Sequence, residues 1–90
     1  MSRRALIVTL SLLSVIHVVA ATLSGVVRDT SGEPLIEATL RLLRARDSSF
    51  VKGTTTNLDG CFSLDAAPGK YILQATYIGY SPADVNVAMT

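Results

Sequence analysis

The stretch that decides the fold spans residues 53–80 and reads GTTTNLDGCFSLDAAPGKYILQATYIGY. It contains two tight-turn signals and short runs in which apolar and polar residues alternate. In the first signal, NLDG at 57–60, the Asn and Asp side chains can bond to the nearby backbone and the glycine can adopt a positive φ. The second signal, AAPG at 66–69, combines a proline that cannot donate to a central ladder with a glycine. The stretch therefore predicts a β-meander.

The runs around these turns have the two-residue period of β-strands. In residues 61–64, Phe62 and Leu64 share one face. Residues 70–78 are rich in aromatic and β-branched side chains on both faces, which is typical of a central strand. Gly79 is expected to end that strand by permitting a kink.

The N-terminal segment, residues 1–21, has the pattern of a secretory leader. Arg3 and Arg4 precede a mostly apolar run, and small residues follow where a signal peptidase would cut. We predict a helical signal peptide over 1–21, cleaved after Ala20 or Ala21, and a mature domain over 22–90. The alternative is a retained membrane anchor, but the run is at the short end of what spans a bilayer. A lipoprotein would need a cysteine directly after the apolar run.

The rest of the chain adds more short strands. Residues 23–28 (LSGVVR), 50–56 (FVKGTTT) and 83–89 (ADVNVAM) alternate, and 29–34 (DTSGEP) is dense in turn formers. Residues 36–45 (IEATLRLLRA) contain good helix formers, but their alternation and the lack of an N-cap favour a strand.

The sequence thus predicts an all-β fold of six or seven antiparallel strands. Short strands at about ten-residue spacing are typical of a Greek-key β-sandwich. The expected core comprises the inward residues of both sheets: Leu23, Val27, Leu40, Leu42, Phe62, Leu64, Tyr71, Leu73, Val85 and Val87.

Size and charge narrow the function classes. The 90 residues suit a single small domain, with 8 Lys+Arg against 7 Asp+Glu. Because Arg3 and Arg4 lie in the leader, residues 22–90 carry a net charge of −1, and we expect no nucleic-acid binding. The one basic cluster, Arg41, Arg44 and Arg46, is interpreted as a solvated face. A single cysteine cannot form an internal disulfide.

Three segments resemble the carboxypeptidase regulatory-like domain, a transthyretin-like (prealbumin-like) β-sandwich. They read SGVVRDTSGEPLIEATLRLL, VKGTTTNLDGCFSL and PGKYILQATYIGY, so the resemblance covers residues 23–87. The most specific positions are Gly25, Val27, Asp29, Gly32, Glu33, Pro34, Leu35, Ala38, Gly53, Asp59, Gly60, Phe62, Gly69, Lys70, Tyr71, Tyr77, Ile78, Gly79 and Tyr80. Each signature glycine also has a structural explanation as a turn or close-approach residue, so the motif specifies a fold and no reaction.

The resemblance implies an exported, non-catalytic accessory domain in the periplasm or outer membrane. Members found in Bacteroidetes-type TonB-dependent outer-membrane receptors follow the signal peptide and precede the plug and barrel. The 90 residues contain no plug or barrel segment, so the sequence fits a receptor extension or remnant, or a stand-alone secreted binding or adhesion module. We expect a protein partner, such as a receptor plug or a periplasmic protein, reached by strand addition at a sheet edge. Membrane association would come only through a receptor barrel.

We predict no catalytic, cofactor-binding or metal site. The only histidine, His17, lies in the leader. The mature domain therefore has no histidine to act as the general base of a small hydrolase, and it has no histidine ligand for zinc. Residues 57–60 lack the full spacing of a calcium loop and are interpreted as a turn.

Two residue types remain with open alternatives. Cys61 is expected to face solvent as an unpaired thiol, with pairing to another chain as the alternative. Tyr71 and Tyr77 are expected in the core and Tyr80 at the surface, with an aromatic binding strip as the alternative.

Overall fold

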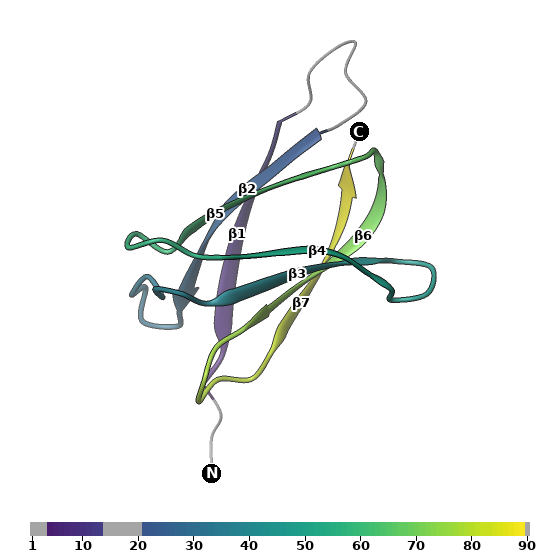
Figure 1. The fold of residues 1–90 in the computed structure, drawn as a ribbon. Helices are drawn as coiled ribbons and strands as arrows, with labels where there is room; N and C mark the ends of the chain where they lie inside the picture. Colours follow the sequence, from purple (N-terminus) through teal and green to yellow (C-terminus); the bar gives the residue numbers. More distant parts are fainter. Residues whose placement is uncertain (1–3, 14–20, 90) are drawn as a thin grey trace.

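The computed structural model describes residues 4–13 and 21–89, which form two antiparallel sheets packed face to face (Figure 1). The strands are β1 (Leu6–Leu13), β2 (Ala21–Asp29), β3 (Thr39–Arg44), β4 (Phe50–Thr55), β5 (Cys61–Ala66), β6 (Gly69–Thr76) and β7 (Ala83–Met89). The three-stranded sheet has the order β1-β2-β5 and the four-stranded sheet has the order β4-β3-β6-β7. The chain crosses between the sheets after β2, β4 and β5. The predicted all-β Greek-key sandwich is confirmed.

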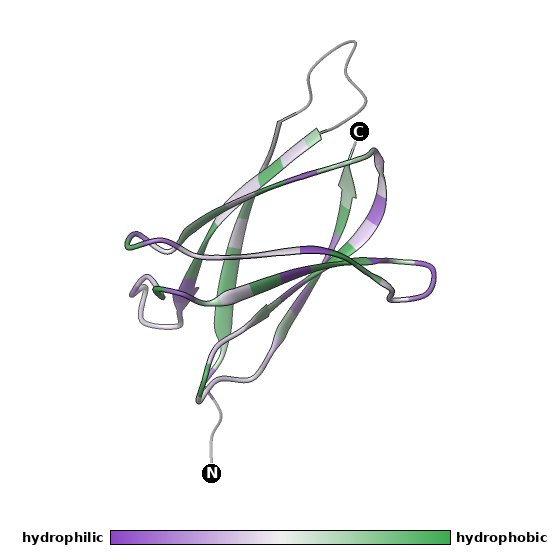
Figure 2. Cartoon of the chain, in the orientation of Figure 1, coloured by the Kyte–Doolittle hydropathy of each residue, from purple (hydrophilic) through white to green (hydrophobic). Residues whose placement is uncertain are grey.

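The core lies between the sheets and matches the predicted one closely. Leu23, Leu40, Leu42 and Leu73 are fully buried, and Val85, which packs partly buried against the cluster, is the predicted member with the weakest burial. Green apolar bands alternate with paler or purple ones along the strands in Figure 2, which is the two-residue period that the sequence predicted. The alternation of apolar and polar residues along the strands thus determines which side chains enter the core.

The N-terminal apolar run differs from the prediction, because Leu6–Leu13 is a strand where a helix was expected. Its alternating residues Leu6, Val8 and Leu10 turn toward the core, and pairing along β2 satisfies its backbone. Tertiary pairing overrides the helix expectation here. Residues 1–3 and 14–20, and with them His17 and Ala20, lie outside the described residues. The leader over 1–21 and its cleavage remain predictions.

Most strand boundaries differ from the predicted ones by one to three residues, and two of these differences have a clear cause in the backbone. The predicted strand over 36–45 begins only at Thr39, since Glu37 has φ 60° and turns the backbone away from the ladder. The predicted strand over 70–78 ends at Thr76, where Tyr80 N–H donates to the Tyr77 carbonyl across a turn containing Gly79 at φ 87°. Ile78 consequently lies 96% exposed at the tip of that turn.

Candidate interaction surface

The described strands leave four positions at the sides of the sheets: β1 and β5 in one sheet, β4 and β7 in the other. An outer strand presents unpaired N–H and C=O groups, so it can accept a further strand. A binding surface of the expected kind must therefore be built on one of these sides. These outer strands carry different side chains, and the turns next to them hold them in place.

The 57–60 turn positions β4 and β5 next to each other. Asn57 Oδ1 accepts hydrogen bonds from the backbone N–H groups of Asp59 (2.9 Å) and Cys61 (3.0 Å), and Gly60 has φ 75°. The asparagine oxygen is thus committed to the turn itself, which supports the turn interpretation over the calcium loop. Within residues 4–13 and 21–89, no group of three or more His, Cys, Asp or Glu side chains is placed to hold a metal ion.

Asp29 organises the loop after β2 and ties it to Tyr80, which lies 51 positions later in the chain. Its Oδ1 accepts from the Ser31 hydroxyl (2.7 Å), the Ser31 N–H (2.9 Å) and the Glu33 N–H (3.0 Å), while the Tyr80 hydroxyl reaches Oδ2 at 3.5 Å. The Ser31 hydroxyl, followed by the Glu33 N–H, holds the pKa of Asp29 below its ordinary value. Asp29 is therefore a carboxylate that holds the backbone of this loop in place, and its hydrogen bonds favour the ionised form.

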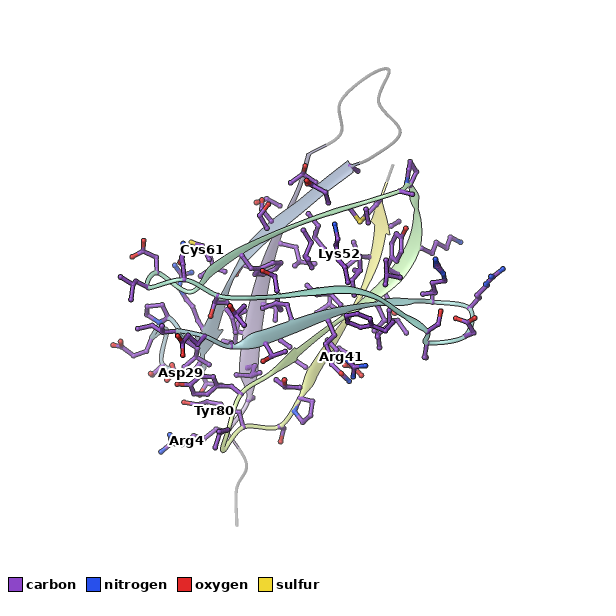
Figure 3. All side chains as sticks on the ribbon, in the orientation of Figure 1. Arg4, Asp29, Arg41, Lys52, Cys61 and Tyr80 are labelled. Atoms are coloured by element: carbon purple, nitrogen blue, oxygen red, sulfur yellow. The ribbon has the colours of Figure 1, made fainter. Side chains whose placement is uncertain are left out.

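Arg4 joins this cluster from the strand segment before β1. Its guanidinium lies 5.5 Å from the centre of the Tyr80 ring, and its carbonyl accepts from Ser81 N–H at 2.9 Å. Figure 3 shows Arg4, Tyr80 and Asp29 gathered at one end of the sandwich. Tyr80 is half-buried there and makes an edge-to-face contact with Tyr77 at 5.5 Å. The prediction of a surface Tyr80 is therefore only partly met, whereas Tyr71 is buried as expected.

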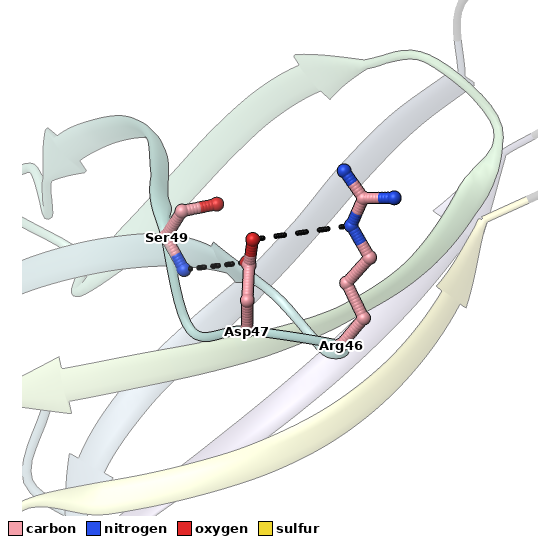
Figure 4. Close-up of polar contacts among 3 residues, drawn as sticks. All are labelled: Arg46, Asp47 and Ser49. Carbon is pink, nitrogen blue, oxygen red and sulfur yellow. Dashed lines mark hydrogen bonds and ion pairs between the residues drawn. The ribbon is translucent and has the colours of Figure 1, made fainter.

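The predicted basic cluster lies exposed along β3 and the turn that follows it. Arg41 lies exposed on β3, where its guanidinium donates to Gln74 Oε1 at 3.2 Å and sits 5.6 Å from the Phe50 ring centre. Figure 4 shows Arg46 in the β3–β4 turn, with its Nε 3.9 Å from Asp47 Oδ2. A pair this exposed contributes little to stability, because water and salt screen it. The cluster is a solvated face, as interpreted from the sequence.

Asp47 shapes that turn more than its ion pair does. Its Oδ1 accepts from the Ser49 N–H at 3.0 Å, and that hydrogen bond is the main reason why the pKa of Asp47 lies below its ordinary value (Figure 4). Ser48 between them adopts φ 60°. The Asp47 side chain therefore acts as a turn cap. Cys61, which was expected to face solvent, is half-buried at the start of β5, and the choice between a free thiol and pairing with another chain remains a prediction.

Two surface features were missed by sequence reasoning. The first is the full-length pairing of β1 with β2; the signal was the alternation of Leu6, Val8 and Leu10 inside the apolar run. The second is a shallow groove lined by Ile36, Glu37, Thr39, Thr76, Tyr77 and Ile78. No periodic pattern points to it, because its residues come from two segments far apart in the sequence, one at the start of β3 and one at the end of β6. No helix in the described part of the chain is long and apolar enough to cross a membrane.

Comparison with known proteins gives a family but no solved relative. The family model of the carboxypeptidase regulatory-like domain matches residues 22–90. The TonB-dependent receptor SusC of Bacteroides thetaiotaomicron is 41% identical over 71 residues, covering 74% of this chain and 6% of the receptor. The chain thus spans only a small part of the length of this relative. No solved structure matches. On its fold, its turn chemistry and these matches, the chain belongs to the carboxypeptidase regulatory-like domain family.

Proposed function

We propose that this chain is an exported, non-catalytic interaction domain of a TonB-dependent outer-membrane receptor, or a remnant of one, and that it acts by protein contact in the periplasm. The observation that carries the proposal is the 41% identity to a TonB-dependent receptor within a domain family whose motif specifies turns. The fold supports it, since Asp29, Asn57 and Gly60 serve the backbone of turns in the structure.

The leader is part of the proposal. Export requires the predicted signal peptide over residues 1–21, and its removal would leave the domain that the family model covers from residue 22. The partner is a protein, such as the receptor's plug or a periplasmic component, and contact through a sheet edge suits a domain rich in strands. A stand-alone binding module is the alternative.

Reading the DNA beyond codon 90 is the first test. An open frame encoding a plug and barrel supports the receptor assignment, whereas a frame that closes at once favours the stand-alone module. In the first case, deleting codons 22–90 while keeping the leader is expected to lower receptor-dependent uptake without lowering the amount of barrel in the outer membrane. Uptake equal to that of the intact gene would count against the proposal.

A further inference from the structure

The side of β2 that β1 covers lacks the features that protect the other outer strands. Charged side chains and nearby prolines normally discourage unwanted pairing. β4 carries Lys52 and pairs across a register shift at Leu42/Leu43, and β7 follows Pro82 and carries Asp84. In β2, by contrast, the run ATLSGVV has no charge before Arg28. Left uncovered, β2 would therefore be a more receptive strand than β4 or β7.

The structure shows which kind of strand fits there. Leu6–Leu13 pairs antiparallel with β2 over eight positions, from Leu6↔Asp29 to Leu13↔Thr22. Leu6 is buried, Val8 and Leu10 are partly buried against the core, and Ile7 between them is 45% exposed. The occupant is thus an extended segment with apolar residues at alternate positions.

Gly25 lies at the centre of this pairing and lets the covering strand approach closely. A Cβ at Gly25 would lie 1.9 Å from the Thr9 carbonyl oxygen, a distance that no real contact allows. The same Cβ would lie 3.0 Å from the Phe62 ring on the core side. The absence of a side chain at Gly25 therefore leaves room for both the Phe62 ring in the core and the backbone of the strand that covers β2.

Removing the leader would take this strand away. The three-stranded sheet would be reduced to β2 and β5, and a two-stranded ribbon is marginal by itself. The contact between Arg4 and the turn before β7, which we call the seam, would also be lost, because the Arg4 carbonyl accepts from Ser81 N–H and the Arg4 guanidinium lies over the Tyr80 ring. The mature domain would then expose the unpaired edge of β2 and the core side chains that Leu6, Val8 and Leu10 cover.

We propose that the β1-facing side of β2, with Gly25 at its centre, is the strand-acceptor site of the mature domain. It takes an extended segment of a partner protein that runs antiparallel to β2, with apolar side chains at alternate positions. This inference rests on the proposed function for the removal of the leader and deepens it by naming the edge and the chemistry of its ligand. In the precursor, Leu6–Leu13 occupies the same site.

The test compares two forms of the full gene product. Export in a Gram-negative host yields the processed chain, and cell-free synthesis without membranes yields the chain with its leader. The probe is a fluorescent peptide with the sequence of residues 6–13 flanked by lysines, and a peptide of scrambled order is its control. The processed chain is expected to bind the probe about tenfold or more tightly than the scrambled peptide, whereas the unprocessed chain binds neither.

Matched glycine variants locate the binding. Gly25→Ala in the processed chain is expected to lower probe affinity about tenfold or more, since its Cβ meets the incoming backbone. Gly53→Ala makes the same change on β4, where the Cβ lies 3.1 Å from the Leu40 carbonyl oxygen, and is expected to leave probe affinity within about twofold. Circular dichroism of each variant shows whether the β-rich fold is retained.

Each other outcome decides the proposal. A processed chain that folds only when the probe is added supports it, because the added strand then completes the sheet. A processed chain that is folded but ignores the probe overturns it, as does one that stays unfolded with saturating probe or an exported chain that keeps its leader. The reading frame beyond codon 90 tests the receptor assignment independently, so the two failures are distinguishable.

Discussion

Gly60 occupies a backbone position that other residues adopt only with strain. Its φ is 75°, and an added Cβ would lie 2.7 Å from the Val27 carbonyl oxygen and 2.9 Å from Pro34 Cβ. We expect Gly60→Ala to lower the free energy of unfolding by about 2–3 kcal/mol, measured by denaturant unfolding. Gly32→Ala is the matched control, because Gly32 has φ 92° but open space around it, and a loss of about 1 kcal/mol is expected there. Equal losses in both variants would contradict the steric explanation.

Thr56 is a buried polar residue that ties the end of β4 to the loop before β3. Its hydroxyl donates to the Leu35 carbonyl and accepts from Ala38 N–H at 2.8 Å. Thr56→Val keeps the shape but leaves both backbone groups buried without a partner, so we expect a loss of about 2–3 kcal/mol in denaturant unfolding. Thr55→Val, at an exposed position of β4, is expected to change stability by less than about 0.5 kcal/mol. A Thr56 variant as stable as the Thr55 variant would refute this role.

Asp29 makes stability depend on pH in a defined direction. Its pKa is lower in the folded chain than in the unfolded chain, mainly through the Ser31 hydroxyl, so the folded state favours the ionised form. The resulting stabilisation is complete above the ordinary pKa of an aspartate, about 3.9, and is lost as the pH falls through the lower folded pKa. Asp29→Asn is expected to flatten the acid limb of the stability curve. Asp47 contributes in the same direction, so the Asp29→Asn, Asp47→Asn pair should be flatter still. Unchanged acid sensitivity in the pair would contradict the assignment.

Local turn chemistry was readable from sequence, whereas contacts between distant residues were not. Asn57 and Gly60 were predicted because asparagine and glycine have specific backbone preferences within one turn. Thr56 bonds to residues 18 and 21 positions away, and Asp29 meets Tyr80 across 51 positions. No short-range pattern encodes such pairs.

At the scale of the elements, β6 is the central strand that the sequence indicated. It pairs with β3 on one side and β7 on the other, and Leu73 at its centre is fully buried. Leu73→Ala is expected to cost about 3–5 kcal/mol in the free energy of unfolding, because the neighbouring strands cannot collapse into the void. Leu58→Ala removes the same atoms from a turn residue that is 78% exposed, and a change below about 0.5 kcal/mol is expected. Similar costs for the two would argue against β6 as the core strand.

Strand positions were predictable from alternation, but strand ends depended on backbone conformations that alternation does not reveal. Residues 83–89 were predicted to the residue. The start of β3 was missed because Glu37 adopts positive φ, which few residues other than glycine do. The strand at Leu6–Leu13 was missed because an apolar run of this kind is read as a helix unless a receptive neighbour such as β2 is known.

At the scale of the whole molecule, the two-sheet architecture followed from the number and spacing of short strands, while the closure of its seam did not. The seam beside β7 is closed by the chain's own N-terminal segment, through Arg4, Tyr80 and Ser81. In the structure Leu6–Leu13 lies beside β2, and the proposed removal of residues 1–21 would make the strand at this position depend on processing. Sequence patterns cannot express such a dependence, because they describe each segment by itself.

Loss of the contact between Arg4 and Tyr80 can be measured by tyrosine fluorescence. The chain has no tryptophan and three tyrosines, so tyrosine fluorescence reports on Tyr71, Tyr77 and Tyr80 alone. Because Arg4 lies over the Tyr80 ring, loss of the leader is expected to increase quenching of this fluorescence by acrylamide. Tyr80→Phe should abolish most of the difference between the processed and unprocessed chains. Tyr71→Phe should preserve the difference, since Tyr71 is buried and bonded to the Ala67 carbonyl, away from the seam. Equal quenching of both forms would show that the N-terminal segment does not cover Tyr80.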